Sequence, residues 1–250
     1  MSWLIKSLSS SLGQKLIMSL TGLFLITFLV VHMAGNLQLL KLDGGESFNI
    51  YTKFMTTSPL IKTVSYLLYA GILVHVIVSI FLTKLNSKAR PVKYEYEQAS
   101  TNSSWASRNM GLLGAIILVF LVVHMRSFWF EMKFGGDVPM VEYGGEEYKN
   151  LYALVVVAFS KWWYSLLYVA SMIFLAFHLS HGFASAFQTL GLNHKKYTPL
   201  IKSVGVAFSV LVPLLFAIQP IAVFLFVQWG LLDPSDYEKM IEMAQLVGNQ

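Results

Sequence analysis

Long stretches of apolar residues alternate with short polar segments along the whole chain. Five of these stretches reach the length of about 20 residues that an α-helix needs to cross the hydrocarbon core of a bilayer. They cover residues 16–40, 60–85, 110–130, 162–190 and 204–229. The pattern predicts an all-α integral membrane protein, with five transmembrane helices in a single domain over residues 1–250.

The composition agrees with this class. Charged residues make up 12% of the chain, whereas soluble domains carry about 25%. The net charge of +5 comes from basic residues beside the apolar stretches, and they form no patch interleaved with aromatic residues that would favour nucleic acid. The chain contains no cysteine, which excludes thiolate-held iron–sulfur clusters and thiolate zinc sites within it.

The positions of the basic residues predict the direction of the helices. If the N-terminus is cytoplasmic, ten of the eighteen basic residues fall on that side: Lys6, Lys15, Lys84, Lys88, Arg90, Lys93, Arg108, Lys195, Lys196 and Lys202. Lysine and arginine gather on the cytoplasmic side of membrane proteins. We therefore expect a multi-pass protein of a bacterial cytoplasmic membrane with its N-terminus inside.

Four histidines lie deep in the predicted helices, one in each of the first four: His32, His75, His124 and His178. Ionisable residues inside a membrane are costly and usually mark a functional site. Each histidine lies roughly 14 to 17 residues from the start of its helix, past the midpoint. Because successive helices run antiparallel, His32 and His124 are expected at one depth in the outer half, and His75 and His178 at another in the inner half.

Two histidines that face each other from different helices are what a bis-imidazole haem requires. The two pairs predict two haems, with His32 and His124 holding the iron of the outer haem and His75 and His178 that of the inner haem. The outer pair lies in a repeated sequence, Phe28 to Met33 and Phe120 to Met125, preceded in register by Gly22 and Gly114. Small residues near the histidines would let a flat ring approach the backbone or would serve helix packing: Ala34, Gly35, Gly71 and Gly182.

Two alternatives remain open at this point. The histidines could instead form hydrogen bonds across the helices of a haem-free transporter or structural anchor. His181 follows His178 by three residues on nearly the same helical face, so spacing alone does not decide which of them would bind iron.

Two segments carry a family resemblance: the first runs from His32 through Asn36 to Gln38, and the second from Phe177 through His178, His181 and Gln188 to Gly191. With these segments and one histidine in each of the first four helices, the chain resembles the cytochrome b subunit of succinate dehydrogenase and fumarate reductase. The resemblance is closest to the single-chain, two-haem type and covers nearly the whole chain. It implies His178 as the ligand that pairs with His75.

The resemblance implies cofactors and partners that the composition does not reveal. They are two haem b groups in this chain, a flavoprotein subunit with covalent FAD, and an iron–sulfur subunit docked on the cytoplasmic face. The complex would be a succinate:quinone oxidoreductase in which this subunit passes electrons to a membrane quinone, expected to be menaquinone. The heterotrimers would be able to pair into dimers. The basic residues of the inner face, including Arg90 and Lys93, would meet an acidic partner or lipid phosphates.

Reduction of a quinone needs polar donors beside an apolar slot. The candidates are Asn36, Gln38, Arg126 and Glu131 near the outer haem, and Lys15, Ser19 and His181 near the inner haem. The alternative function is the dihaem cytochrome b of another quinone-linked enzyme, such as a hydrogenase or formate dehydrogenase. The segment from Ser185 to Gly191 favours the succinate enzyme.

Overall fold

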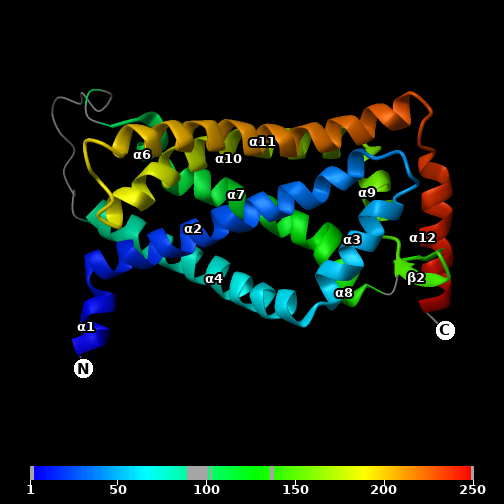
Figure 1. Cartoon of the computed structure of the whole chain (residues 1–250), viewed down its shortest axis with the longest axis horizontal. Helices are drawn as coiled ribbons and strands as arrows, with labels where there is room; N and C mark the ends of the chain where they lie inside the picture. Colours follow the sequence, from blue (N-terminus) through cyan, green and yellow to red (C-terminus); the bar gives the residue numbers. More distant parts are fainter. Residues whose placement is uncertain (1–2, 89–100, 102, 136–137, 249–250) are drawn as a thin grey trace. The chain divides into compact units, whose positions relative to one another are not determined.

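The computed structural model describes residues 3–88, 101, 103–135 and 138–248. It is 83% helical, and its described residues contain five helices long and apolar enough to span a membrane (Figure 1). These spans are Ser11–Leu40, Pro59–Lys88, Met110–Phe134, Trp162–Thr189 and Thr198–Gln228. The prediction of a multi-pass, all-α membrane protein with five spans is confirmed, whereas the assignment of the whole chain to one domain stays a prediction.

Two of the spans are continuous but not uniform. The first consists of α2 (Ser11–Asn36) and a 3₁₀ turn, η1 (Leu37–Leu40). The third begins as α7 (Met110–His124), widens into a π-helix, η2 (Met125–Phe130), and ends as α8 (Glu131–Phe134). The other three are single α-helices: α4 (Pro59–Lys88), α10 (Trp162–Thr189) and α11 (Thr198–Gln228).

The chain divides into two compact units. Unit 1 consists of Met1–Leu29, Ser65–Ile116 and Phe174–Leu211, and unit 2 of Val30–Val64, Ile117–Ile173 and Val212–Gln250. Each boundary falls inside one of the five long helices, so every long helix contributes a segment to both units. Each histidine pair predicted from the sequence therefore belongs to a single unit.

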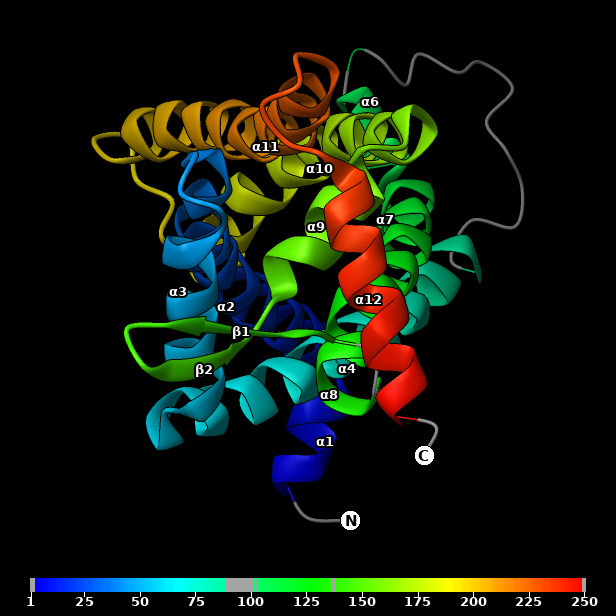
Figure 2. The same cartoon turned by 90° about the vertical axis from the view of Figure 1, so that its right-hand side faces the viewer.

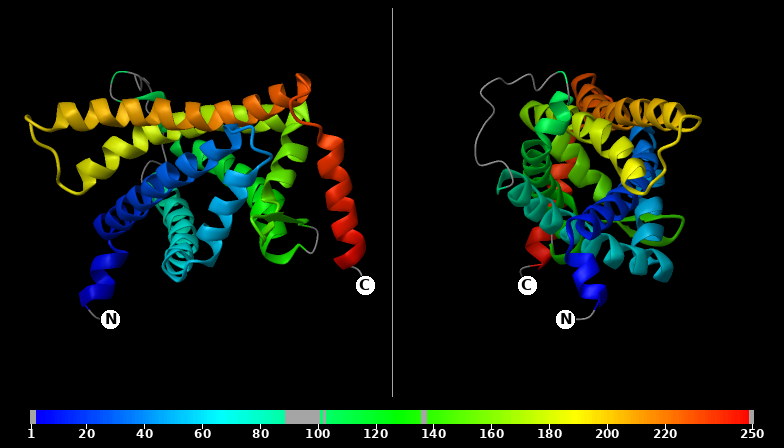
Figure 3. Two further views of the ribbon diagram at one scale, coloured as in Figure 1. Left: turned by 45° about the vertical axis from the view of Figure 1, so that its right-hand side comes forward. Right: turned by 90° about the vertical axis from the view of Figure 1, so that its left-hand side faces the viewer.

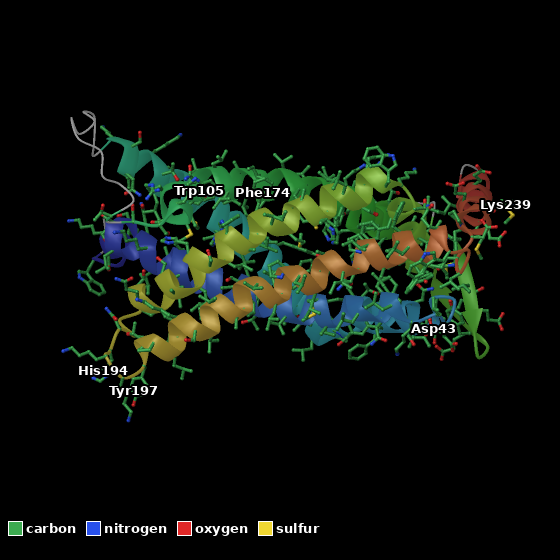
Figure 4. The ribbon with its side chains drawn as sticks, turned by 90° about the horizontal axis from the view of Figure 1, so that it is seen from above. Asp43, Trp105, Phe174, His194, Tyr197 and Lys239 are labelled. Carbon is green, nitrogen blue, oxygen red and sulfur yellow. The ribbon has the colours of Figure 1, made fainter. Side chains whose placement is uncertain are left out.

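Unit 1 adds two short helices to its five helix segments, α1 (Trp3–Ser9) and α6 (Trp105–Arg108). The hydroxyl of Ser104 caps α6 by accepting a hydrogen bond from the backbone N–H of Ser107. The turn between α10 and α11 carries His194 and Tyr197, whose rings lie 5.7 Å apart between centroids (Figure 4). Among its described residues unit 1 contains no aspartate or glutamate, so the charged side chains of those residues are all basic.

Unit 2 carries additional structure outside the spans, which we call the cap. It consists of α3 (Glu46–Thr57), the hairpin β1 (Met140–Tyr143) and β2 (Glu146–Lys149), α9 (Leu151–Phe159) and α12 (Pro234–Gly248). The hairpin turns through Gly144 and Gly145, whose φ angles of 60° and 84° suit a two-residue turn between antiparallel strands. The C-terminal helix α12 packs against α9, and α3 packs against both α9 and β2 (Figures 2 and 3).

A buried network of two asparagines holds the cap together. The side-chain amide of Asn49 on α3 donates to the Asn150 carboxamide oxygen (3.0 Å) and to the Tyr143 hydroxyl (3.2 Å). In return, its own oxygen accepts the backbone N–H of Tyr152 (3.1 Å), while Asn150 caps α9 by accepting from the N–H of Ala153 (3.1 Å). Both asparagines are almost fully buried, so every one of these hydrogen bonds replaces a lost contact with water.

An apolar core continues from the cap into the helices of unit 2. Phe48 and Tyr152 belong to the same buried cluster as Phe159, Tyr164 and Tyr168. Burial raises the pKa of the Tyr152 hydroxyl, which therefore stays neutral at any physiological pH. The cluster connects the cap directly to the side chains that surround one of the histidine pairs.

Candidate functional site

The first histidine pair lies in unit 2. His32 is one turn from the end of α2, and His124 is the last residue of α7; their ring centroids are 5.7 Å apart and their planes are inclined at 81°. The two residues occupy equivalent positions in the repeated sequence of α2 and α7. The same local sequence therefore presents one histidine from each of two helices to a common point.

Aromatic side chains surround this pair. The ring centroids of Phe120 and Phe128 lie 5.9 and 5.6 Å from that of His124, and Phe216 lies 5.6 Å from His32. The hydroxyl of Tyr168 lies 3.2 Å from Nδ1 of His124 and 3.2 Å from the hydroxyl of Tyr164. Tyr168 can accept the Nδ1 proton of His124 while donating to Tyr164. In that arrangement the lone pair of His124 is on Nε2, the nitrogen available to a metal.

The second pair lies in unit 1. His75 of α4 and His178 of α10 have ring centroids 6.5 Å apart, with planes inclined at 64°. Of the two histidines that spacing left open, His178 is thus the one beside His75. Nδ1 of His178 is buried and has no hydrogen-bond partner among the described residues, whereas Nδ1 of His75 lies 3.0 Å from the hydroxyl of Thr21.

The hydrogen bonds of Thr21 define the tautomer of His75. The threonine hydroxyl donates to the backbone oxygen of Ile17 at 2.8 Å, one turn earlier in α2. Its single proton is used there, so at Nδ1 of His75 the hydroxyl can only accept. His75 therefore carries its proton on Nδ1 and its lone pair on Nε2, as a histidine ligand to a metal does.

Two glycines in equivalent positions of α2 and α7 face the unit 1 pair. A Cβ added to Gly22 would lie 3.5 Å from Cε1 of His75, and one added to Gly114 would lie 3.9 Å from Cε1 of His178. The backbone of each helix thus lies close to a histidine ring. The other glycines named from the sequence do not lie against a histidine ring. A Cβ added to Gly35 would meet Tyr51, one added to Gly71 would meet Phe24, and one added to Gly182 would meet nothing within 4 Å.

The donors fit a metal porphyrin held by two imidazoles. Bonds from imidazole nitrogen to a metal are about 2 Å long, so two imidazoles on opposite sides of one metal ion have ring centres roughly 6 Å apart. The two pairs, at 5.7 and 6.5 Å, bracket that separation. Among the described residues no three His, Asp or Glu side chains gather as a metal site without a macrocycle would need, and each pair offers two neutral nitrogen donors.

The unit 2 candidates for quinone binding are engaged with one another or with the pair. Nδ2 of Asn36 lies 3.5 Å from Nε2 of His32, and Arg126 forms an ion pair with Glu131. The side-chain oxygen of Gln38 is buried without a hydrogen-bond partner among the described residues. Arg126 also borders a shallow pocket of about 330 Å³ whose other lining residues are apolar.

The three unit 1 candidates differ in their surroundings. The hydroxyl of Ser19 donates to the backbone oxygen of Lys15 at 2.9 Å within α2, so the two share a helical turn, with Ser19 buried and Lys15 exposed. His181 lines a pocket of about 420 Å³. Of the basic residues expected at this face, Arg90 and Lys93 lie outside the described residues.

Thr21 and Tyr168 are the residues that sequence reasoning missed. Both contact a histidine of the predicted pairs, but neither stands out in the sequence, because serine, threonine and tyrosine are common in membrane helices. The sequence does not give the rotation of each helix, which decides whether such a residue faces a histidine.

Comparison of the chain with models of protein families, with curated proteins and with solved structures gives no match. The functional conclusion therefore depends on the geometry of the two pairs and on the resemblance of the sequence.

Proposed function

We propose that this chain is a dihaem cytochrome b, the membrane anchor subunit of a succinate:quinone oxidoreductase working in the succinate dehydrogenase or fumarate reductase direction. The observation that carries the proposal is the presence of two separate histidine pairs, each formed by two different helices and each with ring centroids about as far apart as two imidazoles bound to one metal would be. Its enzymatic activity belongs to the complex, because succinate is handled by a partner subunit.

His75 and His178 would hold one haem b, and His32 and His124 the other. Such haems would supply one-electron transfer, because each would take both of its protein ligands from a histidine pair and leave no site for oxygen or substrate. The protein supplies the orientation of the ligands: Thr21 accepts the Nδ1 proton of His75, and Tyr168 contacts Nδ1 of His124. Hydrogen bonds of this kind fix ring orientation and raise the basicity of a ligand.

The charges of unit 1 support a cytoplasmic location for this end of the chain. Its described residues include no acidic side chain, and these basic ones are exposed: Lys6, Lys15, Lys84, Lys88, Arg108, Lys195, Lys196 and Lys202. An excess of lysine and arginine is typical of cytoplasmic loops. In this arrangement the N-terminus lies on the cytoplasmic side of a bacterial cytoplasmic membrane. The iron–sulfur subunit would dock on the face formed by unit 1, and the FAD flavoprotein would bind to the iron–sulfur subunit.

The experiment is to purify the chain with its native partners and to measure haem by pyridine haemochrome and by a dithionite-reduced minus oxidised spectrum. The expected result is two b-type haems per chain and copurification of a protein with covalent FAD and an iron–sulfur protein. A colourless complex, or one haem per chain, would refute the proposal. Two haems with a nickel-containing or molybdenum-containing partner would assign the chain to the alternative quinone-linked enzymes.

A further inference from the structure

A shallow groove runs along the third membrane span, over α7 and the π-helix η2 that joins it to α8 (Figure 1). Its volume of about 330 Å³ falls in the range of roughly 300 to 1,000 Å³ that is usual for small-molecule sites. The described residues that line it follow one face of the span: Leu118, Leu121, Val122, Met125, Arg126, Trp129 and Phe130. All of them belong to unit 2.

The groove is apolar along most of its length. The side chains of Leu118 and Val122 are exposed, on a helix long and apolar enough to span a membrane. From Leu118 to Phe130 the span rises by about 18 Å at ~1.5 Å per residue, which is close to the ~15 Å of hydrocarbon that belongs to one leaflet. The groove therefore has the surface and the length to hold one acyl chain of a lipid.

An ion pair lies at the α8 end of the groove, and the π-helix explains it. Nη1 of Arg126 donates to Oε1 of Glu131, the first residue of α8. In an α-helix, residues five apart lie about 140° apart around the axis and point to different faces. In a π-helix they close one turn, so η2 brings Glu131 over Arg126. The side chain of Arg126 is 65% exposed and that of Glu131 19%, so both charges are accessible from outside the chain.

The ion pair can bind more than its two members use on each other. A guanidinium has several N–H donors and a carboxylate has several acceptor sites, and one hydrogen bond joins Arg126 to Glu131. Charged groups on a membrane helix are costly unless polar groups surround them. A simple anion would be repelled by Glu131 and a simple cation by Arg126, and a quinone carries no charge to match either. The group that fits carries an anion and a cation side by side.

We infer that the groove binds one zwitterionic phospholipid with a primary ammonium, phosphatidylethanolamine. Its phosphate accepts hydrogen bonds from Arg126, its ammonium donates to Glu131, and one acyl chain lies along the apolar part of the groove. A choline headgroup suits the pair less well, because its quaternary ammonium has no N–H for the carboxylate. Trp129 and Phe130 lie beside the pair, and aromatic side chains gather at the headgroup level of membranes. The site requires a membrane, and it requires neither haem nor succinate.

Photolabelling in a bilayer tests the site. The purified full chain, with any partners that accompany it, is placed in phosphatidylcholine nanodiscs containing a trace of phospholipid with a diazirine in its acyl chain. The probe has either an ethanolamine or an anionic glycerol headgroup, and labelled peptides are identified by mass spectrometry.

Label in residues 118–130 is normalised to label at the exposed positions Leu73, Ile77 and Phe81 of α4, where lipid contacts the chain without a groove. We expect the normalised label from the ethanolamine probe to be about threefold higher than that from the glycerol probe. A ratio indistinguishable from one, or lower, would overturn the inference. The comparison uses the unaltered chain, so it does not depend on how a variant folds.

Substitutions separate the charges from the shape of the groove. Glu131→Gln removes the anion and keeps Arg126, so the preference should reverse in favour of the glycerol probe, whereas Arg126→Gln should lower labelling by both probes. Val122→Trp fills the groove and should lower both labels about threefold or more. Val119→Trp, an equally large change at an exposed position of α7 that does not line the groove, should leave them unchanged. An undiminished ethanolamine preference in Glu131→Gln would overturn the inference.

Discussion

The two histidine pairs have similar spacing and very different surroundings. The unit 2 pair is enclosed by the rings of Phe120, Phe128 and Phe216, in contact with a buried core that extends to the cap. The unit 1 pair is bordered by two glycines and a threonine. Aromatic packing surrounds the first pair, and close approach of helix backbones borders the second.

The repeated sequence of α2 and α7 accounts for this difference. Each copy contributes a histidine to the unit 2 pair and, ten residues earlier, a glycine to the unit 1 pair. Unit 1 obtains its own histidines from α4 and α10, which lack the repeat. One pair of similar helices therefore provides the histidines of the unit 2 pair and lies close to the histidine rings of the unit 1 pair.

Replacing the histidines one at a time should separate the pairs most strongly. His32→Ala and His124→Ala are each expected to remove the same one of two haems, and His75→Ala and His178→Ala the other, because a bis-imidazole site loses half its ligands in each case. Haem counting and low-temperature spectra of the four variants would show this. His194→Ala, at an exposed turn, serves as the control and should keep both haems.

Enlarging a glycine should affect the unit 1 pair alone. A Cβ at Gly22 would be in ordinary contact with His75, so Gly22→Ala should keep both haems, whereas the longer side chain of Gly22→Leu would have to displace the ring. We expect Gly22→Leu to lose much of one haem and to retain the haem that requires His32. Gly182→Leu, where an added Cβ meets nothing within 4 Å, controls for bulk. Equal haem loss in Gly22→Leu and Gly182→Leu would contradict the close approach.

Removing the asparagine network should destabilise the cap, which belongs to the same unit as the His32–His124 pair. Asn49→Ala leaves the buried N–H of Tyr152 without its partner, at a cost of about 1–3 kcal/mol for a buried group so orphaned. It also removes one of the two donors to the Asn150 oxygen, which keeps the N–H of Ala153. Hydrogen–deuterium exchange should quicken in residues 46–57 and 140–159. Asn86→Ala, at an exposed position of α4, should leave exchange unchanged. If exchange in the cap were equally fast in both variants, the asparagine network would not be what holds it.

Removing the two hydroxyls that contact the histidines should have the smallest effect. Each removal should shift the reduction potential of a different haem. Thr21→Val and Tyr168→Phe each delete one hydrogen bond to a ligand, worth about 1 kcal/mol, or about 40 mV for a one-electron couple. Redox titration should show one haem shifted in Thr21→Val and the other in Tyr168→Phe. A shift of the same haem in both variants would contradict the division into two units.

The membrane spans and the depth of the histidines along them were predictable from the hydropathy of the sequence. The five spans were found because about 20 apolar residues have few alternatives to crossing a membrane, and the histidine pairs followed from depth along antiparallel helices. The structure brings together His32 with His124 and His75 with His178, while iron binding by them stays a prediction.

The cap was not predicted, because its elements are short and tertiary contacts decide them. In the sequence, Asn150 before an apolar run and Gly144–Gly145 between two short strands were available signals for α9 and the hairpin. No comparable signal exists for Tyr168 or Thr21, because whether a residue in a uniformly apolar helix faces a histidine depends on how that helix is rotated.

The π-helix after His124 limits how far the resemblance between α2 and α7 can extend. A π turn behaves as a single extra residue inserted into an α-helix, and one residue rotates everything beyond it by about 100°. The two copies therefore remain in phase through their histidines, and their helical faces diverge across the π turn of Met125–Phe130. Side chains beyond the π turn therefore point in directions different from those of the first copy, while His124 keeps its place at the last regular turn of α7.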